Sequence, residues 1–171
     1  DMGQVLRLLG KYSSNFIAEA LVKAMAVRAF GVPGSWEAGT EALKLRLHAL
    51  GLDLGDARIL DGSGLSRDNR VSPRLLVAAL SASRDSFQVG PELVASLPIA
   101  GGDGTLEKRA EGAAGAVRAK TGLLTGVASL SGFAERRGGQ VVVFSILVNG
   151  FERGAPAARA AIDGFVAALV D

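Results

Sequence analysis

The stretch AKTGLLTGVASLSGF, from Ala119 to Phe133, carries the clearest structural signal in this chain. Apolar and small residues on either side of a glycine-containing break indicate two β-strands, at 117–122 and 127–135. A third strand is predicted at 140–149, after the turn signal Arg137-Gly138-Gly139. Strands joined by such short connections pair in antiparallel order, so the sequence predicts an antiparallel meander.

Helices are predicted before and after these strands in the sequence. From Pro156 to Leu169 apolar residues recur at helical spacing, which predicts an amphipathic helix that covers one face of the sheet. The expected fold class is therefore α/β, of the α+β type. The segment before the sheet is predicted to contain a helix at 14–30 that ends at Gly31 and Pro33, a helix from Thr40 to Gly51, a short strand at 57–60, a Gly-rich loop at 61–69, helices from Ser72-Pro73 and at 91–97, and a second Gly-rich loop at 98–104.

The composition fits one globular domain and excludes several classes of function. The chain has 171 residues, 49% of them hydrophobic, and a domain commonly has about 100–200 residues. The sequence has no cysteine and a single histidine, which excludes thiol catalysis and a zinc site of the H-E-x-x-H kind. That histidine, His48, is expected to be an ordinary helix residue, and we predict no metal and no cofactor.

Charge and hydropathy exclude two classes of partner. The formal net charge is +2, and the basic residues are scattered along the chain, so nucleic-acid binding is not expected. The longest apolar run, at 141–148, is far shorter than the roughly 20 residues that cross a bilayer, so we predict no membrane span.

Two nucleotide-binding motifs fail on inspection. A phosphate-binding loop that ended at Lys120-Thr121 would need glycine where this chain has Ala114 and Ala119. The dinucleotide pattern that could start at Gly62-Ser63-Gly64 meets Arg67 where its third glycine belongs. The sequence therefore gives no support for ATP or a dinucleotide as a ligand.

Two short motifs remain. Ser13-Ser14-Asn15 stands at the start of a predicted helix, and Lys120-Thr121-Gly122 lies on a predicted strand before a hairpin. Each has an ordinary explanation, because Ser13 or Ser14 can cap the helix and the second motif can be a plain strand end. Together, however, S-x-N at a helix start and K-T-G on a strand are two of the three signatures of penicillin-recognising serine acyltransferases.

Five blocks in the same order make this resemblance specific. The chain resembles the penicillin-binding D-alanyl-D-alanine carboxypeptidases of low-molecular-mass class C, a family that also includes D,D-endopeptidases, over nearly all of its length. The resemblance implies a penicillin-binding-protein or β-lactamase-like transpeptidase fold, present in part: a helical part, then three antiparallel strands and a C-terminal helix. It rests on KYSSNFIAE (11–19), VPGSWEAG (32–39), DGSGLSRDN (61–69), LPIAGGDGTL (97–106) and AKTGLLTGVASLSGF (119–133).

The resemblance also implies roles for the residues of both motifs. Ser13 is expected to relay a proton to the leaving amine, with Lys120 close enough to tune it electrostatically. Asn15 is expected to donate and accept hydrogen bonds with the substrate amide, which suits an uncharged carboxamide. Lys120 and Thr121 are expected to face the terminal carboxylate, and Gly122 to let the substrate backbone approach the strand closely.

Other polar residues of the matching blocks have two possible interpretations. Arg67 matches a family position near the donor-peptide pocket, where a guanidinium can hold a carboxylate bidentately, or else it is a solvated loop residue. Lys11 belongs to the same loop as the Ser13-Ser14-Asn15 motif or is a solvated surface lysine. The loop aspartates Asp61, Asp68 and Asp103 are expected to form turns rather than to act in catalysis.

Two features depart from the family pattern. Leu123 follows the K-T-G motif where the family usually offers Thr or Ser, and leucine cannot hydrogen-bond a carboxylate, so recognition of the terminal D-Ala is expected to be weaker. The nucleophilic motif S-x-x-K is absent, because no serine of this chain has lysine three residues later. In the family that motif lies upstream of S-x-N, and its natural place is therefore before Asp1.

These observations predict that residues 1–171 form the C-terminal part of a single penicillin-binding domain, without the N-terminal part that carries S-x-x-K. The function implied is a serine-type D-Ala-D-Ala carboxypeptidase or endopeptidase that works through an acyl-serine intermediate. The chain alone is expected to be inactive and to leave one edge of its sheet unpaired. The expected partners are peptidoglycan stem peptides, β-lactams and a separate N-terminal segment, on the periplasmic or cell-wall side of the membrane.

Two alternatives stay open at the level of sequence. A non-catalytic relative that binds peptidoglycan peptides would also lack the nucleophile, and Leu123 mildly favours it. A class A β-lactamase should show a loop of the form E-x-x-L-N between the two motifs, and Glu37, Glu41 and Glu92 all lack that sequel.

Overall fold

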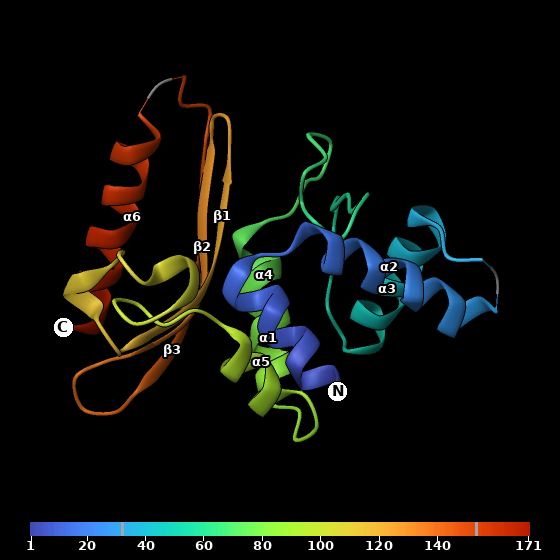
Figure 1. The fold of residues 1–171 in the computed structure, drawn as a ribbon, viewed down its shortest axis with the longest axis horizontal. Coiled ribbons are helices and arrows are strands. Elements are labelled where there is room, and N and C mark those ends of the chain that lie inside the picture. Colours follow the sequence, from blue (N-terminus) through green and yellow to red (C-terminus); the bar gives the residue numbers. More distant parts are fainter. Residues whose placement is uncertain (32, 153) are drawn as a thin grey trace. The chain divides into compact units, whose positions relative to one another are not determined.

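The computed structural model describes residues 1–31, 33–152 and 154–171, so the matching block at 32–39 begins with a residue outside the described part. The chain divides into two compact units. The sheet unit consists of Asp1–Ser13 and Ser83–Asp171, and the helical unit of Ser14–Ala82. Figure 1 shows the elements of both units, which are described in turn.

The sheet unit is built on three antiparallel strands in the order β1 (Val117–Leu124), β2 (Val127–Glu135) and β3 (Val141–Asn149). This confirms the predicted meander, although β1 extends two residues beyond the predicted end at 122. The register pairs Lys120 with Ser131 and Thr121 with Leu130. The outer edge of β3 has no strand partner among the described residues.

One face of the sheet is covered by the C-terminal helix α6 (Ala155–Val170), which runs alongside the strands in Figure 1. The buried side of α6 carries Ile162 and Val166, and these pack with Leu130 of β2 and with Leu106 in one hydrophobic core. Burial of such aliphatic side chains contributes about 1.5–3 kcal/mol each. The amphipathic helix predicted at the end of the chain is therefore confirmed, together with the face that it covers.

The remaining elements of the sheet unit are α1 (Met2–Tyr12), α5 (Gly90–Ser96) and the 3-10 turns η1 (Gly104–Leu106) and η2 (Glu111–Ala113). Helices α1 and α5 lie side by side, and Gly10 allows this because a Cβ there would collide with the Ser96 carbonyl. Helix α1 was not predicted. Its signal was a capping box, in which Asp1 accepts from the Gln4 backbone and Gln4 reaches back to Asp1.

The helical unit contains α2 (Asn15–Phe30) and α3 (Trp36–Ala49), and α4 (Pro73–Arg84) begins in it and ends in the sheet unit. Helices α2 and α3 pack closely, because Gly39 leaves no Cβ to collide with the Val22 carbonyl. The predicted helix at 14–30 and the helix beginning at Pro73 are confirmed. The α+β class follows from these elements.

Two predictions for the helical unit were wrong. The second helix starts at Trp36 with Ser35 as its cap, not at Thr40. Thr40 is buried, and its hydroxyl donates to the Glu37 carbonyl at 3.2 Å. Threonine, which often caps a helix, here lies inside the helix and bonds to the preceding turn. The predicted strand at 57–60 is reduced to one isolated bridge between Arg58 and Arg70.

Candidate functional site

Ser13 occupies a strained backbone position at the end of α1. Its φ and ψ are 55° and 48°, in the left-handed region that non-glycine residues rarely adopt. The neighbouring Ser14 caps α2 by accepting from the Ile17 backbone N–H at 3.3 Å. The ordinary explanation as an N-cap therefore applies to Ser14. Ser13 has a different role, because its hydroxyl faces the β-sheet.

The side chains of Ser13 and Lys120 meet, although they are 107 positions apart in the sequence. The Lys120 ammonium donates to the Ser13 hydroxyl at 2.6 Å and to the Thr121 carbonyl at 2.8 Å. Among the described residues no carboxylate lies within ion-pair distance of Lys120. Burial without a counter-charge lowers the pKa of Lys120 from its usual value, because desolvation penalises the charged amine.

Thr121, Gly122 and Leu123 continue along β1 from Lys120. The hydroxyl of Thr121 donates to the hydroxyl of Thr105 in η1 at 2.8 Å. Gly122 lies opposite Ser129, and a Cβ at Gly122 would collide with the Ser129 hydroxyl. Packing against Ser129 therefore explains why glycine stands at position 122, in addition to the role in substrate approach that was expected for Gly122. Leu123 is 45% exposed and places an apolar side chain next to the motif.

The Gly-rich segment Leu97–Leu106 is fixed to β1 and α1. The backbone around Ile99 pairs with the beginning of β1, through hydrogen bonds from Ala100 to Val117 and from Ala119 to Pro98, both at 3.0 Å. This segment therefore lies along β1 just before the Lys120-Thr121-Gly122 motif.

Lys11 ties the end of α1 to the same segment. Its ammonium donates to the Leu97 carbonyl at 2.5 Å and forms an ion pair with Asp103 at 2.6 Å. Only 15% of its side chain is exposed, so the interpretation of Lys11 as a solvated surface residue is wrong. Asp103 also accepts from the Ile99 N–H at 2.8 Å, which confirms it as a turn-forming residue.

The pKa of Asp103 reflects these contacts. Desolvation by burial raises it, but hydrogen bonds from Lys11 and the Ile99 N–H, and the charges of Lys11 and Arg118, outweigh that effect. The pKa of Asp103 consequently lies below its usual value, and the carboxylate stays ionised next to Lys11.

The helical unit carries the other two residues predicted to bind substrate. Asn15 is exposed at the first position of α2, and Arg67 is exposed in the other Gly-rich segment, Asp61–Asn69. Asp61 accepts from the backbone N–H groups of Gly64 and Ser66, which confirms it as a turn-forming residue. The structure thus brings Ser13, Lys120 and Thr121 together within the sheet unit, whereas Asn15 and Arg67 belong to the helical unit.

Glu19 of α2 anchors the Asp61–Asn69 segment. Its carboxylate accepts from the backbone N–H groups of Gly62 and Ser63, both at 3.1 Å, and from the indole of Trp36 at 2.8 Å. Desolvation raises the pKa of Glu19, but the hydrogen bonds from Ser63, Gly62 and Trp36 together hold it below the usual value. Sequence analysis did not single out Glu19 or Thr105, although both lie in matching blocks.

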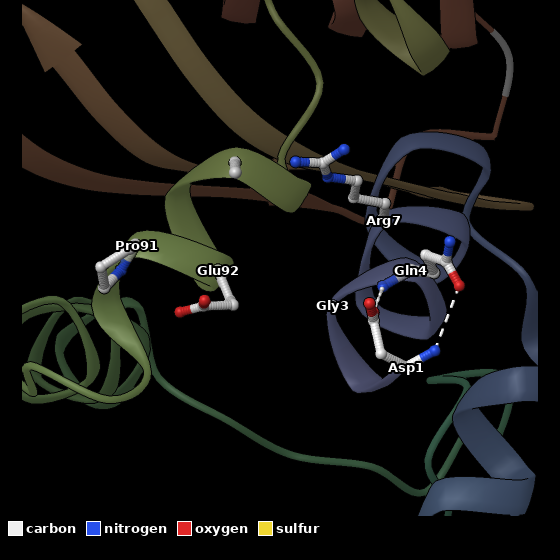
Figure 2. Close-up of a pocket in the computed structure, with 7 residues that line it drawn as sticks. Asp1, Gly3, Gln4, Arg7, Pro91 and Glu92 are labelled. Atoms are coloured by element: carbon white, nitrogen blue, oxygen red, sulfur yellow. Dashed lines mark hydrogen bonds between the residues drawn. The ribbon is translucent and has the colours of Figure 1, made fainter.

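A cavity of about 500 Å³ lies between α1 and α5, away from the two motifs in the sequence. Figure 2 shows that its lining combines the charged groups of Asp1, Arg7 and Glu92 with small residues. None of the predicted site residues lines it. In the described part of the chain there is no cluster of three potential metal ligands. A helix of the length and apolarity needed to cross a membrane was likewise not found there.

Comparison with known proteins extends this description. The model of the D-Ala-D-Ala carboxypeptidase 3 (S13) family matches residues 1–169. Carboxypeptidase DacB of Mycolicibacterium smegmatis is 38% identical over 96% of this chain and 36% of its own length. D-alanyl-D-alanine carboxypeptidase DacB of Haemophilus influenzae is 36% identical over 88% of this chain and 32% of its own length. The chain spans about a third of the length of these curated relatives.

Solved structures give the same result for the fold. Penicillin binding protein 4 (dacB) from Haemophilus influenzae, complexed with a β-lactam, superimposes with a TM-score of 0.82 at 33% identity, over 97% of this chain and 40% of that one. A class A β-lactamase from Bacteroides cellulosilyticus shares the fold, with a TM-score of 0.70 at 18% identity, over 99% of this chain and 62% of that one. The penicillin-binding-protein or β-lactamase-like fold is thereby confirmed. From the matching blocks, the fold and these relatives we conclude that the chain belongs to the D-Ala-D-Ala carboxypeptidase 3 (S13) family.

Proposed function

We propose that this chain is the C-terminal part of a serine-type D-Ala-D-Ala carboxypeptidase or endopeptidase that acts on peptidoglycan stem peptides and binds β-lactams. The observation that carries the proposal is the 2.6 Å hydrogen bond from Lys120 to Ser13, which links the first residue of the S-x-N motif to the first residue of the K-T-G motif. Family membership supports the class of reaction. The attacking serine is proposed to come from a part of the parent protein outside these 171 residues, because no S-x-x-K occurs within them.

In this proposal the hydroxyl of the attacking serine forms a bond to the carbonyl carbon of the penultimate D-Ala, and the bond from that carbon to the terminal D-Ala nitrogen breaks. A base beside the attacking serine takes the proton of its hydroxyl. The leaving nitrogen takes a proton from the Ser13 hydroxyl, the proton held by the base replaces it on Ser13, and water then hydrolyses the acyl-serine. Lys120 donates to Ser13 and so orients the Ser13 proton away from itself. Burial lowers the pKa of Lys120, and this supports a functional role beside Ser13, because groups with a perturbed pKa and a specific partner cluster at functional sites.

The remaining site residues are proposed to bind the peptide. Thr121 donates to the terminal carboxylate, Gly122 allows close approach of the substrate backbone, and Leu123 packs against apolar atoms beside it. Asn15 is proposed to hydrogen-bond the peptide amide and Arg67 to hold a carboxylate of the peptide side chain. The exposure of Asn15 and Arg67 is compatible with these contacts. Peptidoglycan as substrate implies a location on the periplasmic or cell-wall side of the membrane.

Acylation by benzylpenicillin tests the proposal. The full-length protein should gain the mass of one penicillin, measured by intact-protein mass spectrometry, whereas residues 1–171 alone should gain none. Replacing Lys120 by Met keeps an unbranched side chain one atom shorter but removes its donors, and it should slow acylation by about 100-fold or more. An adduct on the 171-residue chain alone would overturn the proposed place of the nucleophile.

A matched control separates a damaged site from a damaged fold. Lys44 lies on α3, and its one ion pair among the described residues is with Glu41 at 3.9 Å, so Lys44→Met should leave acylation unchanged. The second candidate function, a non-catalytic protein that binds peptidoglycan peptides, is favoured by Leu123, which offers no hydroxyl to a carboxylate. It predicts that the full-length protein binds a D-Ala-D-Ala peptide yet forms no adduct and releases no D-alanine.

A further inference from the structure

The hydroxyl groups of Thr105 and Thr121 form a hydrogen-bonded pair, and the proposed function uses only the Thr121 member of it. Their oxygens are 2.8 Å apart, and Thr121 donates to Thr105. Both side chains are half-buried, and they come from different elements, η1 and β1. Thr121 is the residue of the K-T-G motif whose hydroxyl is proposed to meet the peptide carboxylate. Any group that controls the direction of this hydroxyl therefore affects carboxylate binding.

The position of Thr105 is fixed on both sides along the chain. Leu106 is fully buried in the core of the sheet unit. Gly104 has a φ of +56° and lies so close to α1 that a Cβ would be 2.6 Å from the Lys11 carbonyl oxygen. Asp103 is held by Lys11 and by the Ile99 N–H. These contacts leave the Thr105 side chain little freedom to move away from Thr121.

The hydroxyl of Thr105 can accept a hydrogen bond from Thr121 or donate one to it. Each threonine hydroxyl has one proton to donate and accepts through its lone pairs. In the structure Thr121 donates its proton to Thr105. An ionised carboxylate only accepts, so Thr121 must turn its proton to the carboxylate when a peptide binds. The Thr105 proton is then free to turn to the Thr121 oxygen, which keeps the pair bonded and Thr121 oriented.

We propose that Thr105 is a positioning residue for the terminal carboxylate of the peptide: it accepts from Thr121 in the arrangement described above and donates to Thr121 when Thr121 donates to the carboxylate. This inference rests on the proposed function. The Thr121 hydroxyl is important for binding the carboxylate because Leu123, the residue after the K-T-G motif, has no hydroxyl. A donor that itself accepts a hydrogen bond is polarised by it, which strengthens the bond to a charged acceptor.

The test compares the full-length wild-type protein with Thr105→Val and Thr105→Ser. Valine has the shape of threonine without the hydroxyl, and serine keeps the hydroxyl without the methyl group. Each protein is assayed for kcat/KM on one peptide that ends in D-Ala-D-Ala, with a free carboxylate and with a C-terminal amide. For Thr105→Val we expect a loss of about tenfold on the carboxylate and less than about twofold on the amide. Thr105→Ser should stay within about twofold of wild type on both peptides.

Two results would overturn the role of Thr105 and leave the proposed function standing. One is an equal loss on both peptides in Thr105→Val, which indicates a merely structural role. The other is a failure of Thr105→Ser to restore the preference for the carboxylate. If the wild-type protein cleaves neither peptide, the same ratio is taken from the Kd values of the two peptides. A wild-type protein that neither cleaves nor binds them disproves the proposed function, and the inference about Thr105 with it.

Discussion

The two Gly-rich segments of the molecule are held in opposite ways. In the sheet unit the ammonium of Lys11 binds the Leu97–Leu106 segment through a carboxylate and a carbonyl. In the helical unit the carboxylate of Glu19 binds the Asp61–Asn69 segment through two backbone N–H groups. A loop that turns its carbonyl side to a helix needs a cation, and one that turns its N–H side needs an anion.

The two anchors are expected to contribute differently to the free energy of unfolding. Lys11 meets a carboxylate, Asp103, that is 42% exposed, so solvent weakens the ion pair. Glu19 has three N–H partners, and removing it would leave all of them without their acceptor. We therefore expect the helical unit to depend more on its anchor than the sheet unit does.

The largest effect is expected from Gly104, where the sheet-unit segment touches α1. Gly104→Ala should lower the free energy of unfolding by about 3 kcal/mol, because the new Cβ strains a left-handed backbone and collides with the Lys11 carbonyl. Gly115→Ala is the control. It has a φ of +76° with nothing within 4 Å of a Cβ, so it should cost about 1 kcal/mol. Equal losses in urea unfolding followed by circular dichroism would mean that the close approach to Lys11 has no energetic weight.

Removal of the helical-unit anchor comes next. Glu19→Ala should cost about 2 kcal/mol, because the indole and two backbone N–H groups lose a charged acceptor. Glu19→Gln keeps one acceptor oxygen and should cost about half as much. Trp36, the one tryptophan of the sequence, reports the change directly in urea unfolding followed by fluorescence. A Glu19→Ala variant with unchanged unfolding and unchanged emission would remove Glu19 as the anchor.

The sheet-unit anchor is expected to be weaker. Lys11→Met should cost about 1 kcal/mol, and Lys11→Arg less, because arginine can still meet the carboxylate. A double-mutant cycle with Asp103→Asn isolates the pair, and its coupling energy should be about 0.5–1 kcal/mol in low salt. A coupling energy larger than the whole cost of Glu19→Ala would reverse the ranking of the two anchors.

The smallest effect is the dependence of stability on pH. The pKa of Glu19 is lower in the folded chain than its usual value of 4.5, so its stabilising effect is complete above that value. As pH falls below that value, the unfolded chain takes up the proton before the folded chain does. The stabilising effect therefore declines and is lost once pH has fallen through the folded pKa. Urea unfolding between pH 6 and acid should show a shallower decline for Glu19→Gln than for wild type. Parallel declines would contradict the assignment.

The sequence was sufficient for the elements with strong periodic or turn signals. The meander at 117–149 and the closing helix were predicted because alternation, glycine turns and amphipathic spacing are local properties of the chain. The start of α3 was predicted wrongly because Ser35 and Thr40 are both good capping residues, and only packing against α2 selects between them. The prediction of a strand at 57–60 was wrong because Arg58 forms only a single isolated bridge, with Arg70, among the described residues.

The candidate site divides along the same line. Residues such as Ser13, Lys120 and Thr121 could be named in advance because motif spacing and residue type are written in the sequence, and so is the absence of S-x-x-K. The hydrogen bond from Lys120 to Ser13 and the hydroxyl pair of Thr105 and Thr121 depend instead on folding, which brings together residues 107 and 16 positions apart. Burial, pKa and the choice of partner for a polar group depend on such distant neighbours, since the energy of a charge or a hydroxyl is set by what surrounds it.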